Sequence, residues 1–291
     1  MAERRSVAAD VVGSKPTSRP KHLLPSGNRL RPALSRTSQT SSSTSTERLY
    51  AGTSGWAYPT WKPAFYPAGT PAKRFLEFYA TQLTSVEVNY TFRTLPSAKI
   101  LEGWLAATPA NFRFSFKAPQ RITHFKRLRD CRDDVLQFVN TLEPVRQAGK
   151  LGPLLFQLPP NFKADAELLG TFLSNLRLGT NSTQIAFEFR HESWFTEEIY
   201  SVLREHNASL CIAESDNLLT PEINTASDYT CYRLRRTNGY SALELDALAK
   251  RFATMTEQRD VYVYFKHEDE PTGALNAVEF LTRARTATGN S

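Results

Sequence analysis

The chain has 291 residues, 41% of them hydrophobic and 11% aromatic, and a formal net charge of +7. This composition supplies a sizeable core and contains no run of 18 or more apolar residues that would predict a membrane-spanning helix. Cys131, Cys211 and Cys231 have no metal-ligand spacing and cannot all pair, and the N-terminus lacks the apolar segment of a secretory signal peptide. We therefore expect a protein of the reducing cytoplasm, with no membrane partner.

Residues 1–47 differ in composition from the rest. They hold eight Lys or Arg against three acidic residues, and nine of the ten residues from Thr37 to Thr46 are Ser or Thr. Such a segment cannot bury enough apolar surface to offset the entropy of ordering it, so we predict a disordered tail. It could be a nucleic-acid-binding arm, a phosphorylated tail, an organelle transit peptide or a plain unstructured extension. Because this tail carries +5 of the net charge, a strongly basic surface is not predicted for residues 48–291.

Eight short strand-like runs follow the tail, and each ends in polar or charged residues. They are Leu49–Thr53, Ser85–Asn89, Phe112–Lys117, Leu154–Gln157, Ile185–Arg190, Leu210–Glu214, Tyr229–Arg235 and Val261–Lys266. Most are separated by stretches with helical periodicity, and this alternation is typical of a parallel sheet. Eight such repeats predict the α/β class, with a single (β/α)8 TIM-like barrel over residues 48–286 and a C-terminal tail at 287–291.

Apolar periodicity and capping residues predict the intervening helices. The predicted helices are Arg74–Leu83, one capped by Ser97, Asp133–Val145, two that begin at Asp165 and Thr196, one with Ser241 and Glu244 as a capping box, and Ala274–Leu281. Asn207 is expected to end the helix after Thr196 in the left-handed conformation. Only the interval between the sixth and seventh strands is too short for a full helix.

Alternation along the strands indicates which side chains face the barrel lumen. In Phe112–Lys117 the phenylalanines share one parity and should face the helices, which turns Lys117 inward. The same reasoning brings further charged side chains to this end of the lumen, namely Glu87, Glu188, Arg190, Arg233 and His267. Active sites of such barrels lie at the carboxyl ends of the strands, so these are candidate functional residues. The alternative is that they form buried ion pairs that fill the top of the barrel.

The sixth and eighth strands leave their parity open. Cys211 and Ala213 look like lumen residues, which puts Glu214 and Asp216 on the other face unless a bulge intervenes. A metal site would need three or four of these carboxylates and histidines to converge: Glu87, Glu188, Glu214, Asp216, His124 and His267. No ligand spacing such as His-Glu-x-x-His supports one. We therefore predict no cofactor and keep a divalent metal as an alternative.

Aromatic and histidine side chains also follow the strands. Trp56 and Tyr58 lie in a loop with Gly and Pro, where they could stack on a planar ligand or pack over the barrel. His124 follows the third strand and could act as a general acid or base. Trp194 follows the fifth strand.

Five motifs in chain order carry a family resemblance. They are Gly52–Trp56, Val86–Phe92, Phe116–Pro119 with Thr123-His124, Phe156–Pro160 and Phe187–Trp194. Together they resemble the DUF72 (YecE-like) family over about residues 49–285. The resemblance implies a TIM-like barrel and, because this family is a domain of unknown function, no reaction. It maps the family motifs onto Glu87, Asn89, Lys117, His124, Gln157, Glu188, Arg190 and Trp194.

Two strand ends depart from the family pattern. Arg235-Arg236 stands where the resemblance leads us to expect a His-Gly pair, and Lys266-His267-Glu268 stands where it leads us to expect asparagines. Both lie after strands seven and eight, a common phosphate-binding region in TIM barrels. The added arginine favours an anionic ligand.

The leading hypothesis is an enzyme that acts on a small anionic, for example phosphorylated, substrate. Glu87 and Glu188 would act as acid and base, with Lys117 and His124 as further candidate catalytic residues. The candidate substrate-binding residues are Asn89, Gln157, Arg190, Arg233, Trp56, Tyr58, Trp194 and His267. The alternatives are a non-catalytic barrel that binds a ligand or, through its basic tail, nucleic acid, and a metal-dependent hydrolase or isomerase.

Overall fold

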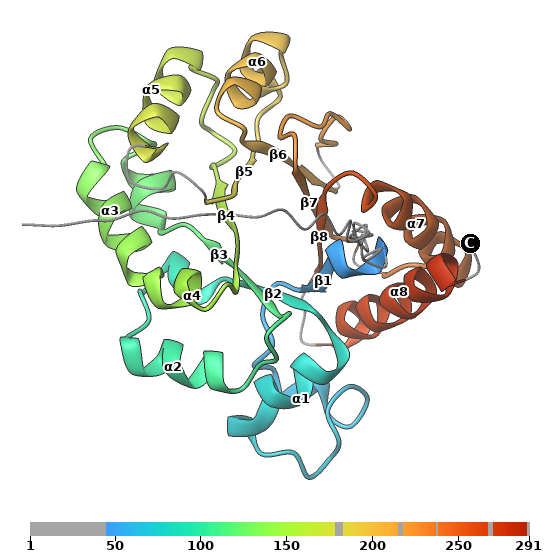
Figure 1. Cartoon of the computed structure of the whole chain (residues 1–291). Helices are drawn as coiled ribbons and strands as arrows, with labels where there is room; N and C mark the ends of the chain where they lie inside the picture. Colours follow the sequence, from blue (N-terminus) through green and yellow to red (C-terminus); the bar gives the residue numbers. More distant parts are fainter. Residues whose placement is uncertain (1–44, 178–182, 215–217, 237, 267–269, 290–291) are drawn as a thin grey trace, which may run out of the picture. The chain divides into compact units, whose positions relative to one another are not determined.

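The computed structural model describes residues 45–177, 183–214, 218–236, 238–266 and 270–289. Within them, eight parallel strands form one sheet in the order β1-β8-β7-β6-β5-β4-β3-β2. The strands are β1 (Leu49–Thr53), β2 (Ser85–Val88), β3 (Arg113–Lys117), β4 (Leu151–Gln157), β5 (Ile185–Glu188), β6 (Ser209–Ala213), β7 (Tyr229–Leu234) and β8 (Asp260–Phe265). Each of the eight predicted runs is a strand, and the TIM-like barrel is confirmed (Figure 1).

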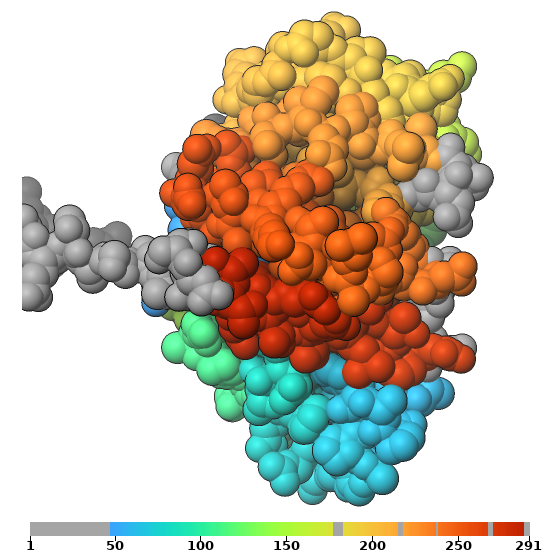
Figure 2. Space-filling view, turned by 90° about the vertical axis from the view of Figure 1, so that its right-hand side faces the viewer, coloured from blue at the N-terminus to red at the C-terminus, as the bar shows by residue number. Residues whose placement is uncertain are grey.

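Helices surround the strands and form the outer layer of the barrel (Figure 1). They are α1 (Phe75–Gln82), α2 (Ala98–Ala106), α3 (Arg132–Thr141), α4 (Glu143–Gln147), α5 (Ala166–Arg177), α6 (Glu197–Glu205), α7 (Ala242–Met255) and α8 (Thr272–Gly289). The predicted capping box of Ser241 and Glu244 opens α7, and Asn207 adopts a left-handed φ of 45° after α6. Figure 2 shows α7 and α8 side by side on one face of the barrel. None of the described helices combines the length and apolar character that crossing a bilayer requires.

The β1–β2 seam closes the barrel without a regular strand ladder. The Tyr79 hydroxyl lies between the two strands, where it accepts a hydrogen bond from Thr53 N at 2.8 Å and donates one to Ser85 O at 3.0 Å. Close approach at this seam requires Gly52, because a Cβ at that position would lie 1.8 Å from Ser85 O. Tyr79 of α1 therefore supplies the hydrogen bonds that the seam lacks.

Side chains of the barrel lumen settle the parity of the strands. Tyr264 of β8 is buried, and its hydroxyl lies 2.8 Å from Ser85 Oγ of β2 and 2.6 Å from Ser115 Oγ of β3. Because alternate residues share a face, Glu87 and Lys117 also point into the lumen. The same alternation assigns Lys266, directly after β8, to the lumen side.

Two predicted helices have different bounds in the structure. The segment predicted as one helix over Asp133–Val145 is broken at Leu142 into α3 and α4. Pro144 explains the break, because proline has no N–H and its ring clashes with the carbonyl four residues earlier. At the C-terminus α8 continues to Gly289, past the domain end predicted at residue 286. The buried face of this helix continues to Ala284, whereas the predicted helix ended at Leu281.

The N-terminal boundary falls in a short turn of 3-10 helix at Ser45–Arg48. Arg48 Nε donates to Asp260 Oδ1 of β8 at 2.8 Å, which ties this turn to the start of the barrel. The disordered tail was predicted over residues 1–47, and residues 45–47 of it belong to this turn. Residues 1–44 lie outside the described part of the chain.

Candidate functional site

Arg233 of β7 joins two buried carboxylates at the top of the lumen. Its Nη2 donates to Glu87 Oε1 of β2 at 2.7 Å, and its Nη1 donates to Glu188 Oε2 of β5. All three side chains are 4% exposed or less. The ion-pair arrangement that the sequence left open as an alternative is therefore present at the centre of the site.

Glu188 uses both carboxylate oxygens in this network. Its Oε1 accepts hydrogen bonds from Gln157 Nε2 at 2.9 Å and Arg190 Nε at 3.0 Å. Burial by itself would raise the pKa of Glu188, but the charges of Arg233 and Arg190 outweigh it and hold that pKa well below its usual range. Glu188 is thus a permanent anion near neutral pH, and it anchors two guanidinium groups.

Two cavities open at the carboxyl ends of the strands, and they share Arg190 and Arg235. The first, of about 490 Å³, is here called the Lys117 cavity, and its lining includes Asn89, Phe92, Arg93, Lys117, Gln157 and Arg233. The second, of about 510 Å³, is called the Glu214 cavity, and its lining includes Glu188, His191, Glu192, Glu214, Thr220 and Lys266. The two shared arginines therefore stand where the cavities adjoin.

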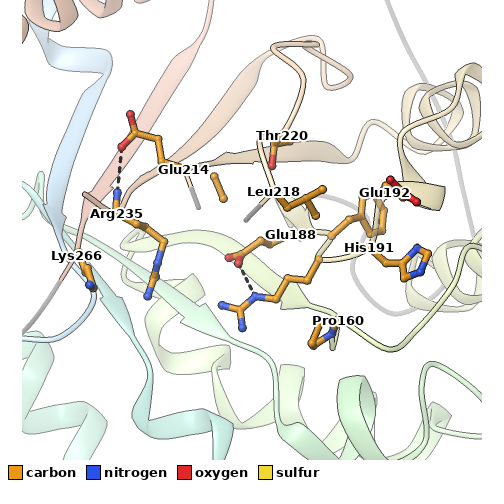
Figure 3. A pocket seen from close by; sticks show the side chains of 12 residues that line it. Pro160, Glu188, His191, Glu192, Glu214, Leu218, Thr220, Arg235 and Lys266 are labelled. Atoms are coloured by element: carbon orange, nitrogen blue, oxygen red, sulfur yellow. Dashed lines mark hydrogen bonds and ion pairs between the residues drawn. The ribbon is translucent and has the colours of Figure 1, made fainter. Parts of the chain in front are cut away.

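Figure 3 shows the Glu214 cavity from close by. Glu188 lies at its centre and holds the Arg190 guanidinium, while Arg235 and Lys266 lie on one side and His191 and Glu192 on the other. Leu218 and Thr220, from the segment after β6, border the cavity opposite Pro160. The floor is thus built by β5 and the ends of β7 and β8.

Arg235 contributes a cation that forms no ion pair with a carboxylate in the described part of the chain. Its side-chain Nη1 is buried and has no hydrogen-bond partner among the described residues. Its backbone N–H donates to Glu214 Oε2 at 3.2 Å, which holds the segment after β7 in place. Burial, followed by the charge of Arg233, lowers the pKa of Arg235, yet a guanidinium stays protonated in proteins. An anion between the two cavities would satisfy this group.

Lys117 at the end of β3 is the second cation without a carboxylate partner. Its Nζ lies 4.1 Å from the centroid of the Phe92 ring, and no hydrogen bond or ion pair joins it to another described residue. Burial lowers the pKa of Lys117 to about 8; Arg233 adds to this effect and Glu87 opposes it. A fraction of the amine is therefore uncharged near neutral pH, and this group can exchange a proton with a ligand.

Three predicted site residues lie beside these groups. His124 sits in a π-helical turn, Arg121–Phe125, with its ring edge-on to Phe92 at 5.0 Å. Burial, followed by the charge of Lys117, lowers the pKa of His124. Asn89 donates from Nδ2 to Ser54 O at 3.2 Å, and its buried Oδ1 has no partner in the described part of the chain. Gln157 lines the Lys117 cavity and fixes Glu188.

The three predicted aromatic contacts are absent from the lining of both cavities. Trp56 packs edge-on against Trp104 of α2 at 5.1 Å, and Tyr58 packs against Trp61 at 4.7 Å. Trp194 is fully buried, stacks on Phe189 at 4.5 Å and donates from Nε1 to Phe162 O at 2.6 Å. The structure places these side chains in the packing around the barrel.

The remaining predictions concern the sixth and eighth strands. β6 pairs with β7 in continuous register over Cys211–Ala213, and Glu214 turns toward the segment after β7, where it accepts a hydrogen bond from Tyr240 Oη. His267 and Asp216 lie outside the described residues. Among those described, no three His, Cys, Asp or Glu side chains are grouped closely enough to hold a metal ion. Arg233 occupies the space between the two glutamates that the metal alternative requires.

Several lining residues were not among the sequence candidates. Phe92, Arg235 and Lys266 belong to this group, although the sequence had marked Arg235 and Lys266 as departures from the family pattern. Arg235 shares its parity with Arg233, and its place after the seventh strand was a usable signal. Phe92 lies within one of the family motifs, but nothing in the sequence shows that Lys117 rests on its ring.

Comparison with known proteins identifies the family. The model of the family "Protein of unknown function DUF72" matches residues 50–290. The chain belongs to the DUF72 family. A DUF72 protein of Thermotoga maritima has a solved structure that superposes with a TM-score of 0.71 at 29% identity, over 81% of this chain and 99% of that chain.

Curated DUF72 relatives carry names that state no reaction. The UPF0759 protein YunF of Bacillus subtilis is 30% identical over 156 residues, or 52% of this chain and 54% of YunF. The UPF0759 protein YecE of Escherichia coli is 31% identical over 150 residues, or 51% of each chain. This chain thus matches about half the length of these relatives. The resemblance read from the motifs is confirmed, together with the TIM-like fold.

Proposed function

We propose that the chain is an enzyme that binds a small anionic substrate at the carboxyl end of the barrel. The observation that carries the proposal is the Arg235 guanidinium, which is partly buried between two cavities and forms no ion pair with a carboxylate of the described residues. Phosphate or carboxylate oxygens match the geometry of such a group. Arg190 lines both cavities as well and extends the cationic surface across their boundary.

The charge balance at this site supports an anion. Five cationic side chains line the Lys117 cavity, and its described lining includes no carboxylate: Arg93, Lys117, Arg190, Arg233 and Arg235. Behind this lining, Glu87 pairs with Arg233, and Glu188 pairs with Arg233 and Arg190. The positive charge that these ion pairs leave over in the cavity is therefore at Lys117, Arg235 and Arg93. A ligand with one or two negative charges would neutralise it with little competition from the protein.

Lys117 is the group in this site best suited to transfer a proton. Catalytic acids and bases work best when their pKa lies near the working pH. The lowered pKa of Lys117 meets this condition, whereas the ion pairs of Glu188 keep that carboxylate charged. We therefore assign the proton transfer to Lys117 in place of the glutamate pair, and we assign the glutamates to the positioning of Arg233 and Arg190.

Anion binding tests the first half of the proposal. Titration calorimetry with inorganic phosphate and with malonate would compare the full chain with Arg235→Gln. A hydrogen bond to a charged group contributes about 1.5–3 kcal/mol, so binding should weaken at least about tenfold. Arg113→Gln is the matched control, because Arg113 lies at the opposite end of β3 over the Tyr50 ring. Equal affinity in Arg235→Gln and the unaltered chain would refute the site.

Turnover tests the second half. The full chain would be incubated with a panel of phosphorylated and carboxylated metabolites, and substrate loss would be followed by mass spectrometry. We expect conversion of a member of the panel that disappears in Lys117→Met and persists in Arg113→Gln. Conversion that survives in Lys117→Met would contradict the assignment of the proton transfer.

A further inference from the structure

We propose that Lys117 is a nucleophilic amine that forms an imine with the carbonyl carbon of a small anionic carbonyl compound, of the 2-oxo acid class. The inference rests on the proposed function, because Arg190 and Arg235 would hold the anionic group while Lys117 meets the carbonyl. It narrows the substrate to molecules in which an aldehyde or ketone stands close to a carboxylate or phosphate.

The surroundings of Lys117 differ from those of a buried lysine with a structural role. Lys150 shows the structural case, because its Nζ donates to Leu105 O at 2.9 Å, to Thr108 O at 2.7 Å and to Thr108 Oγ1 at 3.0 Å. These three acceptors satisfy all the protons of an ammonium group. Lys117 Nζ has only the face of Phe92 within the described structure. A lysine left without acceptors in a partly buried cavity is stabilised as the neutral amine, which is the nucleophilic form.

The position of Lys117 brings the amine to an open cavity. It is the last residue of β3 and lines the Lys117 cavity together with Arg190 and Arg235. Neighbouring cations and an apolar contact are the two features that activate lysine for imine formation. Both are present here, since Phe92 covers one side of the amine and guanidinium groups line the same cavity.

The lowered pKa of Lys117 sets the size of the effect. With a pKa of about 8, about a tenth of the Lys117 side chains are uncharged at pH 7, against about 0.04% for an ordinary lysine. The neutral amine should therefore be about 200 times more abundant at Lys117 than at a solvated lysine. Its reaction should rise about tenfold per pH unit up to pH 7 and level off above pH 8.

The covalent step balances without an oxidant or a reductant. The Nζ lone pair attacks the carbonyl carbon, the C–O π bond breaks, and a proton passes from nitrogen to oxygen to give a carbinolamine. Uptake of one further proton releases this oxygen as water and leaves a protonated imine. The positive charge on the imine nitrogen can then accept electrons from the adjacent carbon when a bond to that carbon breaks.

Reductive trapping tests the inference. The full chain would be treated with pyruvate and sodium cyanoborohydride at pH 7, and modified lysines would be mapped by peptide mass spectrometry. Lys62 is the internal control, because its Nζ also lies over a phenylalanine ring, that of Phe75 at 5.1 Å, but it lines neither cavity. We expect labelling of Lys117 at least about 100-fold above Lys62. Inorganic phosphate should slow it, and Lys117→Arg should abolish it.

Two results would overturn the inference, and the phosphate titration described above separates them. If phosphate binds but Lys117 is labelled no more than Lys62, the imine is wrong and the anion site stands. If phosphate does not bind and Lys117 is labelled no more than Lys62, both the imine and the proposed function are wrong. Selective labelling that Lys117→Arg removes supports the imine.

Discussion

Replacement of Arg233 by methionine removes the one cation that the two buried glutamates share. Glu188 would keep Arg190 and Gln157 as partners, at 3.0 Å and 2.9 Å. Glu87 would lose its ion pair with Arg233, and no other ion pair joins its side chain, which is 1% exposed, to a described residue. The main cost of Arg233→Met therefore comes from a carboxylate left without a counter-charge away from water.

In Arg233→Met the Glu87 carboxylate either stays charged or takes up a proton, and each of these two states costs free energy. Breaking a buried ion pair by removal of one partner costs about 3–5 kcal/mol. Taking up a proton instead costs about 4 kcal/mol at pH 7 for a glutamate of ordinary pKa. We therefore expect Arg233→Met to lower the free energy of unfolding by about 4 kcal/mol at pH 7, and by about 1.4 kcal/mol less for each unit that the pH falls towards 5.

Urea denaturation followed by circular dichroism measures this loss. Arg283→Met is the matched control, because Arg283 pairs with Glu279 at 2.7 Å on the surface of α8 and should cost less than about 1 kcal/mol. An unfolding free energy within about 0.5 kcal/mol of the unaltered chain for Arg233→Met would refute the reasoning. So would a loss that stays constant between pH 7 and pH 5.

Three further predictions concern Glu188 and the β1–β2 seam. The pKa of Glu188 is lowered in the folded state, so its charge stabilises the fold above the usual glutamate pKa, and this contribution is lost as the pH falls towards the folded value. The difference in unfolding free energy between the unaltered chain and Glu188→Gln, measured by urea titration, should therefore shrink below about pH 4.3. Tyr79→Phe leaves Thr53 N and Ser85 O without their partner, and calorimetric unfolding should show a loss of about 2–3 kcal/mol; an unchanged Tm would contradict this. Gly52→Ala forces a Cβ to within 1.8 Å of Ser85 O, so urea unfolding should report a loss of about 3 kcal/mol, and a neutral effect would show that the seam can open.

Strand parity carried most of the sequence prediction of the site. Because side chains alternate along a strand, the sequence predicts which of them face the lumen. The lumen-facing residues include Glu87, Lys117, Glu188 and Arg233, as predicted. Parity does not say which inward residues meet, because this depends on the stagger of strands around the barrel. The sequence could therefore place two glutamates and an arginine at one end, but could not show that Arg233 lies between them.

The sequence also could not show which side chains pack against one another. Trp194 lies at the end of the 3-10 turn Glu192–Trp194 that follows β5, where an aromatic side chain can meet a ligand or the core. Its stacking on Phe189 and its hydrogen bond to Phe162 depend on contacts across the fold, which no local pattern encodes. The break before Pro144 was different, because the missing N–H of proline was visible in the sequence and signals a helix boundary by itself.

Measurement of the Lys117 pKa tests the account most directly. Competitive labelling of the full chain with trace acetic anhydride between pH 6 and pH 11, followed by quantification of the Lys117 and Lys62 peptides, gives the titration of each amine. The account predicts half-maximal labelling of Lys117 near pH 8, and a curve that moves to higher pH when phosphate is added, because a bound anion favours the ammonium form. A Lys117 midpoint near 10.4, the value of an ordinary lysine, would contradict both the proton transfer and the imine.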